Sequence, residues 1–95
     1  MFYRVTNYEY APERQEEILS WTSTITEQVR AIEGLVAVDV FEAMPGESII
    51  VAAYDSQEAF EAASGTIGGV LGELGQFLTG PPVTASGTPF WTTRT

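Results

Sequence analysis

The side chains that could do chemistry in this chain are amides, phenols and carboxylates, because it contains no histidine, cysteine or lysine. Asn7 can orient a substrate oxygen without titrating, since an amide offers both donors and an acceptor. Tyr3 and Tyr54 can each donate a phenolic hydroxyl to a substrate carbonyl. The candidate catalytic residues are therefore Asn7 and Tyr54, and Tyr3 is a candidate for substrate binding. The alternative for Asn7 is a polar residue near a strand end that meets solvent or loop backbone. The alternative for the two tyrosines is an ordinary half-buried position in a strand.

Two further side chains could contribute to a pocket. Trp21 lies on an apolar stripe and is a candidate substrate-binding residue that could line an aromatic pocket, although core packing is the favoured interpretation. Asp39 shares a strand face with Phe41, so its carboxylate could serve as a base in apolar surroundings. The alternative for Asp39 is an ion pair with Arg4.

A stripe of glycines marks the later part of the chain. Gly65, Gly68, Gly72 and Gly75 recur at spacings of three and four, which leaves one side of a helix bare. Gly68 and Gly72 are candidate substrate-binding positions, where a flat ligand could approach the backbone. Close packing against another element is the alternative. The spacing is not that of a phosphate-binding loop, and no basic residue follows it.

The elements that must position these residues follow from periodicity and punctuation. Aromatic and β-branched residues predict strands, and apolar residues three and four apart predict helices. Gly34 and Gly80-Pro81-Pro82 are expected to end the helices, and Ser64-Gly65 to break or kink the second one. The predicted elements are a strand at 1–10, a helix from Pro12 to about Ile32, strands at 35–43 and 48–54 joined by a turn at 44–47, a helix at about 56–78, and a strand within 83–95 that carries Phe90 and Trp91.

This β-α-β-β-α-β order predicts an α+β, ferredoxin-like fold, in which one antiparallel sheet carries both helices on a single face. The opposite face is expected to be apolar and to need a cover. We therefore predict a homodimer joined through its sheets as a dimeric α/β barrel, sealed by Phe90 and Trp91. The residues expected on the open face are Phe2, Leu35, Phe41, Ile50 and Ala52.

Length and charge bound the remaining possibilities. A chain of 95 residues predicts one domain, covering 1–95. Thirteen acidic residues against four basic ones give a net charge of −9, which disfavours binding to nucleic acid or to an anionic membrane. No apolar run approaches the roughly 18 residues that a membrane span needs, and the N-terminus does not resemble a secretory signal, so a cytoplasmic location is expected. Without histidine or cysteine, we expect no metal and no cofactor.

Four segments resemble the dimeric α/β-barrel superfamily, and within it the antibiotic-biosynthesis monooxygenase-like domains. The third of them is similar to the family's W-x-S-x-E-A-F entry to its second helix. The likeness covers nearly the whole chain. The segments are Tyr10-Ala11-Pro12-Glu13, Ile32-Glu33-Gly34-Leu35, Tyr54-Asp55-Ser56-Gln57-Glu58-Ala59-Phe60 and Leu78-Thr79-Gly80-Pro81-Pro82-Val83.

The resemblance implies a ligand cleft between sheet and helices in each subunit. The family that the chain resembles includes cofactor-free oxygenases and haem-degrading enzymes. The haem-degrading branch uses an asparagine, a tryptophan and a histidine. Asn7 matches the first, but Tyr54 stands at the tryptophan position and no histidine exists, so haem turnover by that route is not expected.

Two functions follow as hypotheses. One is a cofactor-independent oxygenase that acts on an aromatic, phenol-like small molecule. The other is a non-catalytic ligand-binding or regulatory homodimer of the same fold. A cleft of roughly 300 Å³ or more, with polar groups directed into it, would favour small-molecule chemistry.

Overall fold

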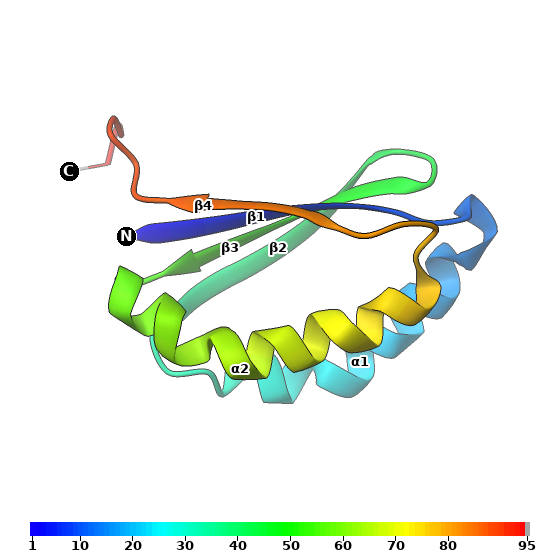
Figure 1. Ribbon diagram of the computed structural model, residues 1–95, viewed down its shortest axis with the longest axis horizontal. Helices are drawn as coiled ribbons and strands as arrows, with labels where there is room; N and C mark the ends of the chain where they lie inside the picture. Colours follow the sequence, from blue (N-terminus) through cyan, green and yellow to red (C-terminus); the bar gives the residue numbers. More distant parts are fainter. Residues whose placement is uncertain (95) are drawn as a thin grey trace.

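The computed structural model describes residues 1–94 as four strands and two helices (Figure 1). Each helix is extended by a 3₁₀ turn, at Pro12–Arg14 before the first and at Gly75–Phe77 after the second. The elements are β1 (Phe2–Glu9), α1 (Gln15–Arg30), β2 (Leu35–Met44), β3 (Glu47–Tyr54), α2 (Gln57–Leu74) and β4 (Val83–Gly87). Within residues 1–94, no helix has the length and apolar character needed to cross a membrane.

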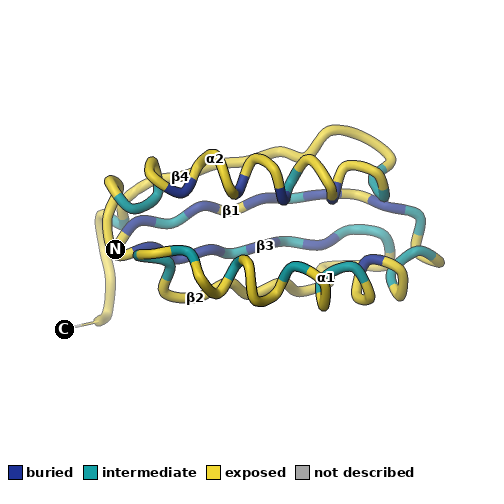
Figure 2. Tube along the Cα trace, turned by 90° about the horizontal axis from the view of Figure 1, so that it is seen from below, coloured by how far each residue is buried: buried dark blue, intermediate teal, exposed yellow. Residues whose placement is uncertain are grey.

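The strands form one antiparallel sheet in the order β2-β3-β1-β4. Both helices lie on the same face of this sheet, and the other face is bare (Figure 1). This is the ferredoxin-like α+β fold that the element order predicts. In Figure 2 the buried residues concentrate along the two central strands, β1 and β3.

Alternation along β1 assigns its side chains to the two faces. Phe2, Arg4 and Thr6 are buried toward the helices, whereas Val5 and Asn7 point to the open face. The pairing of β1 with β3 then fixes the phase of β3, meaning which of its residues face the helices and which face the open side, because directly opposed residues share a face.

This phase corrects the expected composition of the open face. Phe2, Leu35, Ile50 and Ala52 belong to the core clusters on the helix side, so their predicted place on the open face is wrong. Only Phe41 of the predicted set lies there, opposite Ile49. The segment Ser48–Tyr54 is apolar at almost every position, so its sequence carries no alternation from which the phase could be read.

Helix α2 runs without interruption from Gln57 to Leu74, so the predicted break at Ser64-Gly65 is wrong. The Ser56 side chain caps its start by accepting a hydrogen bond from the Ala59 amide at 3.1 Å. Glycine costs a helix only about 1 kcal/mol relative to alanine. Burial of Ile67, Val70 and Leu74 on one side is sufficient to hold the helix through its glycines.

The last strand is shorter than the sequence suggests. β4 ends at Gly87, so Phe90 and Trp91 lie outside it, contrary to the prediction that the strand carries them. Both side chains are exposed. In Figure 1 the chain after β4 rises on the side of the sheet away from the helices.

Gly34, between α1 and β2, offers a direct test of the packing. Its φ is +82°, and a Cβ there would lie 2.5 Å from the Ala59 Cβ. We expect Gly34→Ala to lower the free energy of unfolding by about 2–3 kcal/mol through backbone strain and overpacking, measured by urea denaturation. Gly72→Ala is the control: nothing lies within 4 Å of its position, and it should stabilise α2 by about 0.5–1 kcal/mol. Equal stability of the two variants would contradict this packing.

Candidate functional site

A cavity of about 530 Å³ lies between the sheet and the two helices. Helix α1 covers the β2 side of the sheet and α2 the β4 side (Figure 2), and the cavity lies between them. It is accessible along the edge strand, where Val38 and Val40 are exposed although they point toward the helices. Its walls are mainly apolar, with Ile18, Ile25, Val40, Ile50, Ile67 and Leu71 among the lining residues.

One end of the cavity holds a connected set of hydroxyls and a carboxylate. The Tyr10 hydroxyl lies 2.8 Å from Glu42 Oε2 and 2.8 Å from Ser48 Oγ. Since the phenol has one proton and donates it to Glu42, the Ser48 hydroxyl donates to the Tyr10 oxygen. Burial raises the pKa values of Tyr8 and Tyr10, and hydrogen bonding to Ser48 opposes this. Both phenols are therefore protonated near neutral pH, and Glu42 is the only carboxylate among the lining residues.

The other end of the cavity carries a buried cation. Arg4 lines the cavity, is only 7% exposed, and its Nε has no hydrogen-bond partner within residues 1–94. The Tyr54 hydroxyl, on the adjacent strand, is fully buried and is also without a partner in that part of the chain. Burial lowers the pKa of Arg4 and raises that of Tyr54, and each group partly offsets the shift of the other.

The two candidate catalytic residues lie on opposite faces of the sheet. Tyr54 is packed on the helix side, where its ring meets Phe60 edge-on at 5.4 Å. Asn7 lies on the open face and donates to Glu47 Oε1 at 3.3 Å. The expectation of a single cleft that contains both residues is therefore wrong. A catalytic role for Asn7 stays a prediction, and it would have to operate on the open face.

Three other candidates are also displaced from the cavity. Tyr3 lies on the open face, with the Arg94 guanidinium 5.5 Å from its ring centre. Gly68 and Gly72 are exposed, and each has open space where a side chain would project, so neither borders the cavity. The glycine stripe is exposed because the larger residues of α2 are packed toward the sheet. Asp39 is exposed on the open face, which excludes it as the partner of Arg4.

Trp21 does line the cavity, as the pocket interpretation predicts. Its indole Nε1 donates to Glu73 Oε1 at 3.2 Å, and its ring lies 6.0 Å from that of Phe77. These contacts join the start of α1 to the end of α2, so they position Trp21 as part of the cavity wall.

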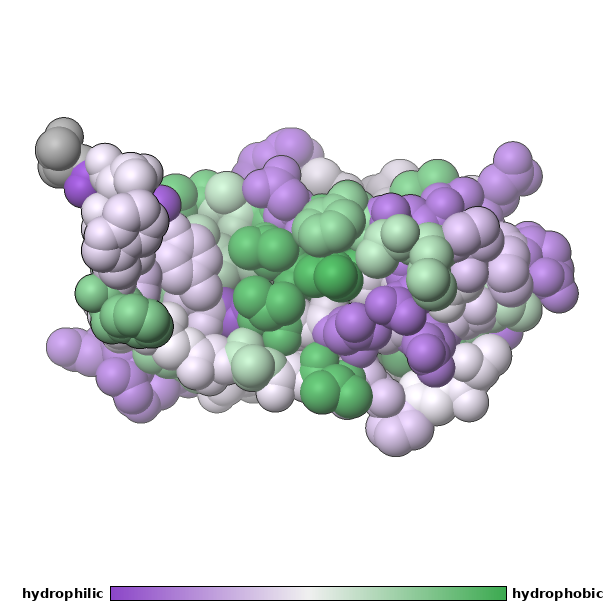
Figure 3. Space-filling model, turned by 90° about the horizontal axis from the view of Figure 1, so that it is seen from above, coloured by the Kyte–Doolittle hydropathy of each residue, from purple (hydrophilic) through white to green (hydrophobic). Residues whose placement is uncertain are grey.

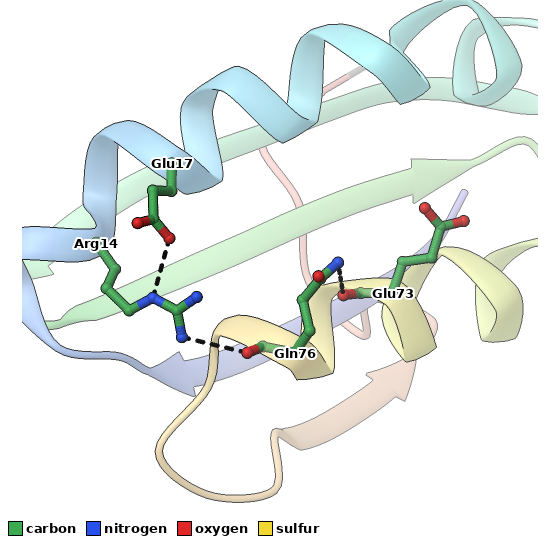
Figure 4. A network of polar contacts seen from close by, with 4 residues as sticks. All are labelled: Arg14, Glu17, Glu73 and Gln76. Atoms are coloured by element: carbon green, nitrogen blue, oxygen red, sulfur yellow. Dashed lines mark hydrogen bonds and ion pairs between the residues drawn. The ribbon is translucent and has the colours of Figure 1, made fainter.

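A second set of contacts closes the same end of the fold (Figure 4). Arg14 Nε pairs with Glu17 at 3.0 Å, and its NH1 donates to the Gln76 carbonyl at 3.2 Å. Gln76 in turn donates to the Glu73 carbonyl at 2.9 Å. The network is exposed, so we assign it to positioning the helix ends rather than to chemistry.

Residues that the sequence does not single out therefore make the polar ends of the cavity: Arg4, Tyr8, Tyr10, Glu42 and Ser48. For Arg4 and Tyr8, the alternation of side chains along the strand does carry a signal. Arg4 and Tyr8 have the same parity as Phe2 along β1, so a buried Phe2 implies that both point to the same side. Glu42 gave no such signal, because a glutamate near a turn is typical of an exposed surface.

A family model described as antibiotic biosynthesis monooxygenase matches residues 1–67 of this chain. No curated protein matches the sequence. Among solved structures, Rv0793 from Mycobacterium tuberculosis is 18% identical with a TM-score of 0.79, over 98% of both chains. The monooxygenase from the gene ActVA-Orf6 of Streptomyces coelicolor, in complex with nanaomycin D, is 20% identical with a TM-score of 0.79, over 99% of this chain and 91% of that one. At these identities the likeness concerns the fold.

Proposed function

Because this chain belongs to the antibiotic biosynthesis monooxygenase family, we propose that it is a cofactor-independent oxygenase of an aromatic, phenol-like small molecule. The observation that carries the proposal is the cavity between sheet and helices, which combines apolar walls with a carboxylate-linked set of hydroxyls. A volume of about 530 Å³ falls in the range of small-molecule sites.

The reaction requires that the substrate supply the electrons. A phenol with a free ring position reacts with O₂ to give a quinone and water. One oxygen atom replaces the ring hydrogen as a carbonyl oxygen, and the other leaves as water with that hydrogen and the phenolic proton. The protein must bind and orient the ring, accept the phenolic proton and limit access of water.

Glu42 is the group proposed to accept the phenolic proton. Its carboxylate borders the cavity and already accepts a hydrogen bond from the Tyr10 hydroxyl, a geometry that a substrate phenol could share. Trp21 is proposed to bind the substrate ring. At the opposite end, Arg4 lines the cavity and is proposed to donate to a substrate oxygen, while Tyr54, whose buried hydroxyl does not border the cavity, is proposed to position Arg4.

The second candidate function is a non-catalytic ligand-binding homodimer. One observation favours it: Glu42, the only carboxylate among the lining residues, is exposed to solvent rather than held in a dry site. Such a protein would use the same cavity without turnover.

Oxygen uptake separates the two functions. The protein is incubated with a panel of naphthols and anthrones in air-saturated buffer, and consumption of O₂ is followed with product mass. Oxygenation predicts a product with one more oxygen and two fewer hydrogens, formed in proportion to the O₂ consumed. Binding detected by calorimetry without O₂ uptake across the panel would support the non-catalytic function.

A further inference from the structure

The buried guanidinium of Arg4 has no anion to balance it. Two of the other three arginines have carboxylate partners at the surface: Arg14 pairs with Glu17 and Arg30 with Glu27. Within residues 1–94, no carboxylate lies within ion-pair distance of Arg4, although the chain has 13 acidic residues. A buried, uncompensated charge costs stability. The one deeply buried arginine is therefore also one that the fold leaves unpaired.

A second orphan group lies beside it. Arg4 and Tyr54 are diagonal neighbours on paired strands, since Arg4 opposes Ala52 and Phe2 opposes Tyr54. The Tyr54 hydroxyl and the Arg4 Nε are the two buried side-chain polar atoms without a partner in the described part of the chain. Buried polar atoms are nearly always hydrogen-bonded, so two adjacent exceptions mark a place where the described part of the chain leaves the bonding incomplete. Arg4 borders the cavity there and Tyr54 does not, so a ligand in the cavity can meet this place through the Arg4 guanidinium.

The chemistry of the pair selects an anion. A guanidinium and a phenol both donate hydrogen bonds, and a planar guanidinium is suited to the two oxygens of a carboxylate. The elements around the pair contribute apolar side chains, among them Phe2, Ala52, Ala63 and Ile67, so Arg4 is the buried cation that a bound anion would meet there. Arg30 also lines the cavity, but its charge is paired with Glu27 at the surface.

We propose that Arg4, with Tyr54 packed beside it, forms an anion-binding end of the cavity, and that the ligand is an aromatic acid whose anionic group lies there while its hydroxyl lies at the Tyr10–Glu42 end. This inference deepens the proposed function and rests on its assignment of the cavity as the ligand site. Arg4 and Tyr8 are four residues apart on one strand face, about 13 Å at 3.3 Å per residue. That spacing suits a ligand of two or three fused rings with substituents at both ends.

Calorimetric titration with a matched pair of probes tests the proposal. The probes are a hydroxynaphthoate with its two substituents on opposite rings and the corresponding neutral hydroxynaphthamide. We expect the wild-type protein to bind the carboxylate at least about tenfold more tightly than the amide, since hydrogen bonds to charged groups are the stronger ones.

Arg4→Met should abolish this preference. Affinity for the amide should change little, and the carboxylate should bind no better than the amide because the chain has a net charge of −9. The variant should have a melting temperature equal to or above that of the wild type, because it removes an unpaired buried charge. Arg94→Met is the matched control: Arg94 lies over the Tyr3 ring on the open face and does not line the cavity, so its loss removes the same charge and should leave the preference intact.

Each outcome has one meaning. Equal wild-type affinity for the two probes overturns the anion site, whatever the Arg4 variant does, and so does a preference that survives Arg4→Met. If the Arg4→Met variant fails to fold, Arg4→Lys, which keeps the charge but loses the planar pair of donors, must reduce the preference several-fold, or the proposal is wrong. Carboxylate preference without O₂ uptake supports this inference and refutes the oxygenase. Failure of both probes to bind refutes the cavity as ligand site and both proposals with it.

Discussion

Replacing Phe41 with glutamate is expected to leave the protein monomeric, because we predict that two wild-type chains pair through the open face of the sheet. Phe41 is 51% exposed on the face of the sheet that no helix covers. In a symmetric dimer the substitution would place an unpaired carboxylate in the interface twice. At about 3 kcal/mol for each buried, uncompensated charge, the dissociation constant should rise by roughly 10⁴-fold.

The open face itself motivates this expectation. Figure 3 views the molecule from this side and shows hydrophobic side chains gathered near its centre. Register and alternation assign Val5, Phe41, Ile49, Val51 and Ala53 to this face. A contiguous apolar patch of this kind is unusual on a monomer and typical of an interface. In a two-fold symmetric dimer, the same patch on a second copy of the chain would cover it.

The exposed tail adds to the same surface. The segment that follows β4 lies on the open side of the sheet (Figure 1). Phe90 and Trp91 belong to this segment, and both side chains are exposed. A partner sheet would give both side chains a surface to cover. An interface of about 800 Å² per subunit is sufficient for a stable complex.

Light scattering coupled to size exclusion at micromolar concentration measures the result. Leu19→Glu is the control, because Leu19 is 60% exposed on α1, on the helix side of the sheet. That variant should remain dimeric. A wild-type protein that is monomeric at about 0.15 M salt, where charge repulsion is screened beyond about 8 Å, would refute the two-sheet dimer.

Much of the fold can be predicted from the sequence because local signals act within a few residues. Gly46 adopts φ +86° in the turn that Pro45-Gly46 predicts, and Ser56 caps the second helix. Apolar residues at helical spacing predict α1 from its stripe alone. Such signals need no knowledge of what a segment packs against.

The candidate site was harder to predict because it depends on the phase of each strand. In β3 apolar residues fill nearly every position, so both faces look alike until the strand is paired with β1. In β2 a register shift between Leu35 and Ala37 moves Leu35 to the helix side. The prediction of one cleft for Asn7 and Tyr54 fails for this reason, since the two residues lie on opposite faces.

Replacing Glu42 with glutamine is expected to lower the rate of oxygenation at least about 100-fold, the scale of general base catalysis. The amide keeps the size of the side chain, and its oxygen can still accept the hydrogen bond from Tyr10. What it loses is the ability to take a proton from a bound phenol. Ligand affinity should therefore change by only a few fold, so the loss should appear in kcat rather than in KM.

Glu47→Gln provides the matched control for this effect. Glu47 is on the neighbouring strand, accepts a hydrogen bond from Asn7 on the open face, and does not border the cavity. The Glu47→Gln substitution removes the same charge from the protein as Glu42→Gln, so any general effect of net charge on the reaction appears in both variants. Oxygen uptake at saturating substrate should fall only in the Glu42 variant. Equal rates in the two variants would show that Glu42 is not the base, and equal loss in both would assign the effect to surface charge rather than to proton transfer in the cavity.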